Sequence, residues 1–76
     1  MTTKAYVLIE TQVGRTKQVV DAARKLPGVV SVDTVTGPYD IIAIVQAETL
    51  NDIGELIVSK MHPIARISRT ATCLAL

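Results

Sequence analysis

The run Thr36-Gly37-Pro38-Tyr39-Asp40 is the densest group of residues that could recognise a small molecule. Glycine allows close approach of the backbone, and proline fixes a turn. Tyrosine offers a flat apolar face with a hydroxyl group, and the aspartate carboxylate can hold an ammonium group. Exposed N–H groups of such a loop can receive a carboxylate, so the run as a whole could bind a zwitterion. The alternative interpretation is hairpin chemistry, in which Asp40 bonds the backbone of its own turn.

The remaining residues of chemical interest stand alone. His62 has no Asp, Cys or second His at the spacing of a metal site or catalytic triad, and before Pro63 it is typical of a helix end. Cys73, the single cysteine, is expected to be a small core residue. Glu10 is expected to be a rim charge, with a ligand contact as the alternative, and Gly14 a turn residue, with a ligand at the helix N-terminus as the alternative. We therefore expect no catalytic residue, no metal ligand and no cofactor.

The hydrophobic periodicity predicts the elements that must position these residues. Strands are expected over residues 4–11, 29–36, 41–47 and 64–76, and helices over 15–26 and 50–61. The helices present apolar stripes, which are Val19, Val20, Ala23 and Leu26 in the first and Leu50, Ile53, Ile57 and Met61 in the second. Thr49 is expected to cap the second helix together with Asp52. The short link over 37–40 requires an antiparallel hairpin.

The expected order is βαββαβ, which makes residues 1–76 a single α+β domain of the ferredoxin-like plan, a four-stranded antiparallel sheet with both helices on one face. The expected central strands are apolar on both faces. In the first strand Ala5, Val7 and Ile9 point one way and Tyr6 and Leu8 the other, and in the third strand Ile41, Ala43 and Val45 oppose Ile42 and Ile44. In the last strand, alternation places Arg66, Ser68, Thr70 and Thr72 on one face and Ile67, Ala71 and Cys73 on the other. A sheet with one solvated face should instead alternate apolar and polar residues, so we expect the second face to meet another copy of the chain.

Composition excludes several classes of protein. The chain has 76 residues, 49% of them apolar, with a mean hydropathy of +0.38, which is more apolar surface than one small core needs. No apolar run approaches the ~20 residues of a membrane-spanning helix, and no signal peptide is recognisable, so a cytoplasmic location is expected and no membrane partner. The net charge is +1 and the eight basic residues are scattered, unlike a nucleic-acid-binding stripe.

Two segments carry a family resemblance. Pro27-Gly28-Val29-Val30-Ser31-Val32, followed by Thr36-Gly37-Pro38-Tyr39-Asp40, resembles the pattern "pGV..v..vtG.yD" of the Lrp/AsnC effector-binding domain, also called RAM, for regulation of amino acid metabolism. The resemblance extends over essentially the whole chain. It implies a non-enzymatic module for an amino acid effector, with ligand-binding residues Gly37, Pro38, Tyr39 and Asp40, joined by Thr34, Thr36, Thr70 and Thr72.

The resemblance also implies partners. Members of this family form sheet-to-sheet homodimers, of the dimeric α+β barrel type, that assemble into octamers or decamer-like rings. Typical members carry an N-terminal helix-turn-helix domain, whereas this chain begins at the first strand of the sensor. We therefore expect no direct DNA binding, and regulation of transcription or amino acid metabolism through full-length Lrp/AsnC regulators. The sequence does not specify which amino acid binds or how many subunits assemble.

Other functions are compatible with the same order of elements. An ACT-like amino-acid-binding module would use Gly14 in the first strand-to-helix loop. A small dimeric α+β-barrel enzyme would need an acid, base or nucleophile from His62, Glu10, Asp33 and Tyr39, among which no convincing pair stands out. An adaptor would only oligomerise. RNA binding on the sheet needs more aromatic residues than Tyr6 and Tyr39.

Overall fold

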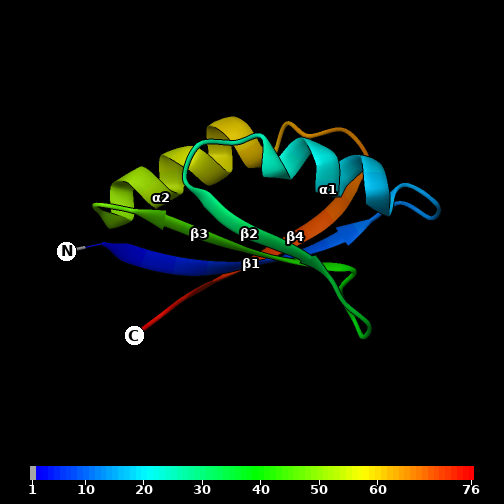
Figure 1. Ribbon diagram of the computed structural model, residues 1–76, viewed down its shortest axis with the longest axis horizontal. Coiled ribbons are helices and arrows are strands. Elements are labelled where there is room, and N and C mark those ends of the chain that lie inside the picture. The colour runs from blue at the N-terminus through cyan, green and yellow to red at the C-terminus, as the bar shows by residue number, and fades with distance from the viewer. Residues whose placement is uncertain (1) are drawn as a thin grey trace.

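The computed structural model describes residues 2–76, and Figure 1 shows its single sheet with the helices on one side. The elements follow in the predicted order, βαββαβ. They are β1 (Thr3–Thr11), α1 (Thr16–Arg24), β2 (Val29–Thr34), β3 (Ile41–Ala47), α2 (Leu50–Leu56), a π-helical continuation η1 (Ile57–Met61), and β4 (Ile67–Leu74). The ferredoxin-like prediction is confirmed. None of the helices formed by residues 2–76 is long and apolar enough to cross a bilayer.

Six of the element ends differ from the prediction, two of them by a single residue, since β1 begins at Thr3 and α1 at Thr16. The first helix stops at Arg24 rather than at residue 26, because residues before a proline disfavour the helical conformation. The second strand stops at Thr34 rather than at residue 36, since the N–H of Val35 already donates to Asp40 to close the hairpin loop. The last strand begins at Ile67 and ends at Leu74, not at residues 64 and 76. Residues 62–66 form turns, and Arg66 has a positive φ of 77°.

The strands are all antiparallel and lie in the order β2-β3-β1-β4. The central strands β1 and β3 pair from Thr3 opposite Ala47 to Ile9 opposite Ile41. The hairpin between β2 and β3 is therefore confirmed, and β4 and β2 are the edge strands.

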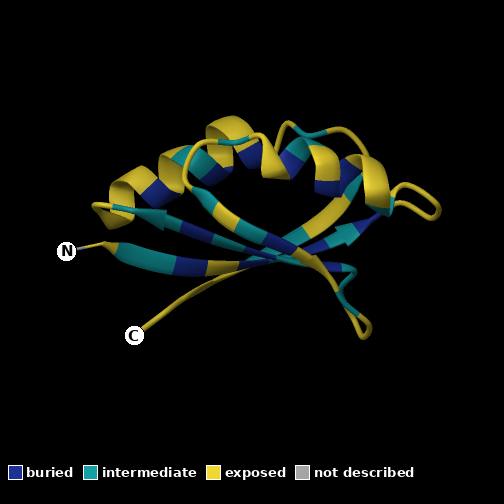
Figure 2. Ribbon diagram, viewed as in Figure 1, coloured by how far each residue is buried: buried dark blue, intermediate teal, exposed yellow. Residues whose placement is uncertain are grey.

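The hydrophobic core lies between the sheet and the helices, where Figure 2 shows the buried segments facing one another. Its main members are Ala5, Val7, Ile9, Val19, Val20, Ala23, Val32, Ile41, Ala43, Val45, Ile53, Ile57 and Met61. The predicted helical stripes are confirmed except at Leu50, which is 56% exposed. Leu50 belongs to the first turn of α2, where Asp52 N–H donates to Thr49 Oγ1 at 3.1 Å as expected for the cap.

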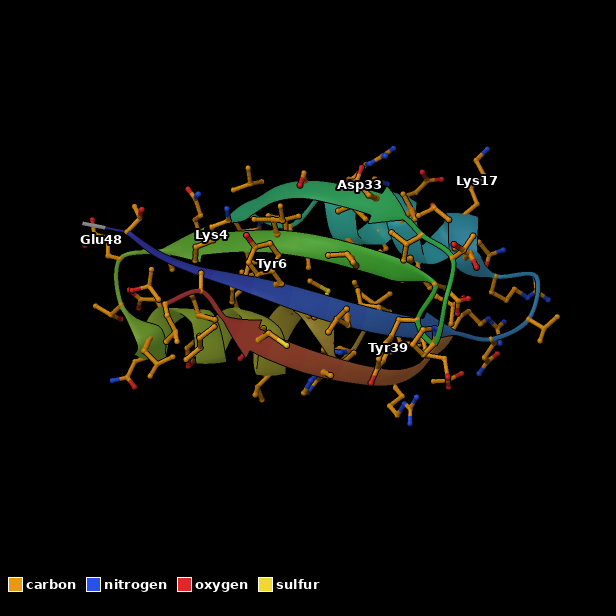
Figure 3. The ribbon with its side chains drawn as sticks, turned by 90° about the horizontal axis from the view of Figure 1, so that it is seen from below. Lys4, Tyr6, Lys17, Asp33, Tyr39 and Glu48 are labelled. Atoms are coloured by element: carbon orange, nitrogen blue, oxygen red, sulfur yellow. The ribbon has the colours of Figure 1, made fainter. Side chains whose placement is uncertain are left out.

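The opposite face of the sheet, here called the open face, is not covered by any helix. Pairing register assigns to it Lys4, Tyr6, Leu8 and Glu10 of β1, Ser31 and Asp33 of β2, Ile42, Ile44 and Gln46 of β3, and Arg69, Ala71 and Cys73 of β4. Figure 3 looks onto this face, with Tyr6 near the middle. The predicted split of apolar residues between two faces is therefore confirmed.

A β-bulge reverses one prediction for β4. Glu10 pairs with Arg69 but Thr11 pairs with Ile67, so one extra residue, Ser68, is inserted opposite β1. Simple alternation placed Ile67 with Ala71 and Cys73, whereas the inserted residue turns it toward the helices, where it packs against the core. The sequence prediction for Ile67 was wrong for this reason.

Candidate functional site

Asp40 fixes the corner where the β2–β3 hairpin meets the end of β1. Its N–H donates to the carbonyl of Ile9 at 2.9 Å, and its carbonyl accepts from the N–H of Val35 at 2.8 Å. Its Oδ2 accepts from Thr11 N–H at 2.8 Å and from Thr11 Oγ1 at 3.2 Å. The alternative prediction, that Asp40 bonds the backbone of its own turn, is wrong in its partner, because the side chain bonds Thr11 of β1.

The same hydrogen bonds continue into α1. Thr11 is buried, and its Oγ1 lies 2.8 Å from Thr16 Oγ1, on the first residue of the helix. Asp40, Thr11 and Thr16 thus link the hairpin loop, the end of β1 and the helix layer. Within residues 2–76, the other carboxylate oxygen of Asp40, Oδ1, receives no hydrogen bond.

The loop that this corner holds presents backbone donors to its surroundings. Among the described residues, no acceptor is found for the N–H groups of Thr36, Gly37 and Tyr39, and Pro38 has none to offer. Gly37 has a φ of 125°, a conformation that L residues rarely adopt, and nothing lies within 4 Å of where its Cβ would be. A zwitterion needs hydrogen-bond donors for its carboxylate and an acceptor for its ammonium group. The loop offers both, since three N–H groups and one carboxylate oxygen have no partner among the described residues.

Tyr39 extends this corner toward the edge strand β4. Its ring centroid lies 5.1 Å from the guanidinium carbon of Arg69, a cation–π distance. Arg69 also lies 3.5 Å from Glu10 Oε2 in an exposed ion pair, which agrees with the prediction that Glu10 is a rim charge. Figure 3 shows Tyr39 at the end of the open face near β4. Arg69 and Thr11 were not predicted as site residues, because only the pairing of β1 with β3 and β4 brings them to the corner.

The four predicted threonines separate into two groups. Thr34 and Thr36 are exposed and lie at the start of the hairpin loop, next to Gly37. Thr70 and Thr72 point to the helix side of β4. The hydroxyl of Thr70 lies 3.2 Å from His62 Nε2. Thr70 is opposite Ile9 in the sheet, one strand away from the corner, so only Thr34 and Thr36 adjoin the loop in a single subunit.

Two of the surface hollows formed by residues 2–76 stand out, and neither includes a residue of the 36–40 loop. One, of about 410 Å³, lies between the α1–β2 turn and α2, and it is lined by Pro27, Gly28, Gln46, Ala47, Asp52, Glu55, Leu56, Ser59 and Lys60. The other, of about 330 Å³, lies between α2 and β4, and it is lined by Leu50, Ile53, Gly54, Ile57, Val58, Thr72 and Leu74. The predicted corner is therefore an exposed edge of the subunit rather than part of either hollow.

Three other residues considered in the sequence, His62, Gly14 and Cys73, lie outside the 36–40 loop. His62 lies at the end of the helical segment, as predicted, with its N–H donating to Ile57. Gly14 lies in the exposed β1–α1 turn with a φ of 78°, as expected for a turn glycine. Cys73 is exposed on the open face, so its assignment to the core was wrong. It pairs with Tyr6 on the side of the sheet that no helix covers.

The sequence model of the Lrp/AsnC ligand-binding domain matches residues 4–76. The chain belongs to this family. An uncharacterised HTH-type transcriptional regulator of Pyrococcus furiosus is 33% identical to the Lrp/AsnC domain described here over 76 residues, a match covering 96% of this chain and 51% of that protein. The domain thus spans about half the length of the curated relatives it matches.

Solved structures agree with the assignment. A protein of Thermus thermophilus superimposes on this Lrp/AsnC domain with a TM-score of 0.92 at 31% identity, over 97% of this chain and 92% of that one. A transcriptional regulator of Neisseria meningitidis, solved as a complex with L-Met, shares the fold, with a TM-score of 0.87 at 14% identity over 97% of this chain and 49% of that chain. The fold and the ligand-binding family are therefore both established.

Proposed function

We propose that this Lrp/AsnC domain is a non-enzymatic module that binds an amino acid at the corner formed by residues 36–40. The carboxylate of the ligand accepts hydrogen bonds from the free N–H groups of the loop, and its ammonium group donates to Asp40 Oδ1. The pairing of unused donors with an unused carboxylate oxygen on one loop is the observation that carries this proposal. The L-Met complex of the Neisseria regulator supports the ligand class.

We further propose that the corner becomes a pocket only when subunits assemble. In one subunit it is open to solvent, and small-molecule sites are normally concave enough to bury most of the ligand. Homodimers joined through their open faces, associating into larger rings, would close it from the outside. Full-length Lrp/AsnC regulators are the proposed partners through which binding acts on transcription.

Calorimetric titration of the assembled protein with each of the twenty amino acids tests the binding site. Asp40→Asn keeps an oxygen that can accept from Thr11 but removes the charge that would hold an ammonium group. We expect it to weaken binding of the responding amino acid roughly tenfold to a hundredfold, the range for a charge-assisted hydrogen bond. Asp21→Asn, an exposed aspartate of α1, is the matched control and should leave affinity unchanged.

Two results would contradict the proposal in different ways. If none of the twenty amino acids gives heat or raises the unfolding temperature, the domain is an adaptor that only oligomerises. If an amino acid binds equally well to wild type and Asp40→Asn, the ligand lies elsewhere. In that case Gly14→Trp examines the first strand-to-helix loop that an ACT-like module would use.

A further inference from the structure

Glu10 lies at the point of β1 to which Asp40 is bonded. The N–H of Asp40 donates to the carbonyl of Ile9, and its carboxylate accepts from the N–H of Thr11. Ile9 and Thr11 are the two residues that flank Glu10 in the chain, and Glu10 itself pairs with Arg69 of β4. Glu10 and Arg69 therefore adjoin the corner at which the ammonium and carboxylate groups of the ligand are proposed to bind.

The Glu10–Arg69 pair leaves most of its hydrogen-bonding capacity unused. Arg69 Nη2 lies 3.5 Å from Glu10 Oε2, which is longer than the roughly 2.7–3.2 Å of a well-formed N–H···O bond. The Arg69 side chain is 59% exposed and that of Glu10 is 39% exposed. Within residues 2–76, the other N–H groups of the guanidinium and the second carboxylate oxygen, Glu10 Oε1, have no hydrogen-bond partner. The pair therefore offers a free donor and a free acceptor next to each other.

Tyr39 keeps the guanidinium of Arg69 near the 36–40 loop. The sheet order places β4 two strands away from β3, to which the loop leads. Two strand spacings amount to about 10 Å. The guanidinium carbon nevertheless lies only 5.1 Å from the centroid of the Tyr39 ring, and Figure 3 shows Tyr39 at the end of the open face near β4. A ligand held by the loop can therefore reach Arg69 with its side chain.

We propose that the Glu10–Arg69 pair selects amino acids whose side chain ends in a carboxamide, which are glutamine and asparagine. The carboxamide oxygen accepts a hydrogen bond from the guanidinium of Arg69, and the carboxamide NH2 group donates to the carboxylate of Glu10. This inference rests on the proposed function, which assigns the ammonium and carboxylate groups of the ligand to Asp40 and the loop. It goes further because it specifies the side chain of the ligand.

Charged and apolar side chains match this pair less well. An acidic side chain would attract Arg69 but meet the carboxylate of Glu10, and a basic side chain would attract Glu10 but meet the guanidinium. Such contacts between like charges are costly. An apolar side chain would remove water from both charged groups without offering a hydrogen bond in return. A carboxamide is neutral and carries an acceptor and a donor, so it satisfies both partners at once.

Calorimetric titration of the assembled protein with amino acids of nearly equal size tests the preference. Glutamine is compared with glutamate and methionine, and asparagine with aspartate and leucine, so that each carboxamide has an acidic and an apolar counterpart. At least one carboxamide should bind roughly tenfold or more tightly than both of its counterparts, because they leave a charged group opposed or without a partner. The relative affinities of glutamine and asparagine show which of the two lengths the site accepts.

Two variants change the preference in different ways. Glu10→Gln keeps an acceptor but removes the charge that opposes an acidic ligand, so the ratio of carboxamide to acid affinity should fall about tenfold. Arg69→Met removes the donor, so the ratio of carboxamide to apolar affinity should fall to within about threefold of one. Glu48→Gln and Lys17→Met remove the same charges at exposed residues outside the open face and should keep both ratios.

The possible failures of the two proposals are distinguishable. An acidic, basic or apolar amino acid that binds more tightly than the carboxamides, and loses affinity in Asp40→Asn, would overturn the carboxamide preference and leave the corner as the binding site. Ratios in Glu10→Gln and Arg69→Met equal to those of wild type would also overturn it. If no amino acid binds to wild type, the proposed function fails together with this inference. Each ratio is taken within one variant, so a loss of stability that affects all ligands alike does not alter it.

Discussion

The two faces of the sheet are built from similar residues but differ in what covers them. On β3, Ile41, Ala43 and Val45 are fully buried beneath the helices, while the intervening Ile42 and Ile44 are only partly buried on the open face. One set of apolar side chains therefore lies in the core, and a second set lies on a face of the sheet that no helix covers. The residues of the open face and of the 36–40 loop that borders it are those on which the proposed functions depend.

Ile41→Ala and Ile42→Ala provide the sharpest comparison of the faces, because they are the same change in adjacent residues. Ile41→Ala should lower the free energy of unfolding by about 2–5 kcal/mol, since it leaves a cavity in the core. Ile42→Ala should cost less within the subunit and appear chiefly as weaker association, which makes the unfolding temperature depend more steeply on protein concentration. Urea unfolding at several protein concentrations measures both effects. Equal losses at both positions would show that the two faces do not have separate roles.

The same glycine-to-alanine change should have opposite effects on stability in the loop beside the open face and in the helix layer. Gly37→Ala should destabilise the protein by about 1–2 kcal/mol, because the φ of 125° is strained for any residue with a Cβ. Gly54→Ala, in α2, meets nothing within 4 Å and should stabilise the protein by about 0.5–1 kcal/mol. Thermal unfolding distinguishes the two signs directly. A neutral Gly37→Ala would indicate that the loop can leave the conformation with a positive φ at residue 37 at no cost.

The smallest effect is expected for Arg69→Ala at the rim of the open face. Its ion pair with Glu10 is exposed on both sides, so removal should change the free energy of unfolding by less than about 1 kcal/mol. Urea unfolding of this variant beside Arg24→Ala, which removes a hydrogen bond from the guanidinium to the carbonyl of Val32, provides a comparison. A larger loss at Arg69 would mean that the rim stabilises the subunit itself.

Much of the fold could be predicted from local patterns. Alternation and helical spacing gave the order of elements, the exact range of β3 and the two apolar faces, because each depends on residues close together in the chain. The pattern failed at Ile67, since the extra residue Ser68 reverses the face of Ile67 relative to the positions that follow the bulge. It also failed at Cys73 and Leu50, because apolar character does not tell which surface a subunit leaves uncovered.

The loop of the candidate site could be predicted from the sequence, but the residues that hold the loop in place could not. Glycine, proline, tyrosine and aspartate in one short run indicated where a ligand could be held, and the structure keeps these residues together. Thr11 lies 29 residues before Asp40, and no local rule connects the two. Such contacts depend on the register between β1 and β3, which a single sequence does not encode in any short motif.

Hydrogen bonds run from Asp40 through Thr11 to Thr16 and so join the 36–40 loop to the first turn of α1. Thr11 accounts for both steps, because it bonds Asp40 on the hairpin side and Thr16 on the helix side. A substitution of Thr11 that removes its hydroxyl group would therefore remove the side-chain hydrogen bonds that join the 36–40 loop to the start of α1, although Thr11 belongs to neither element.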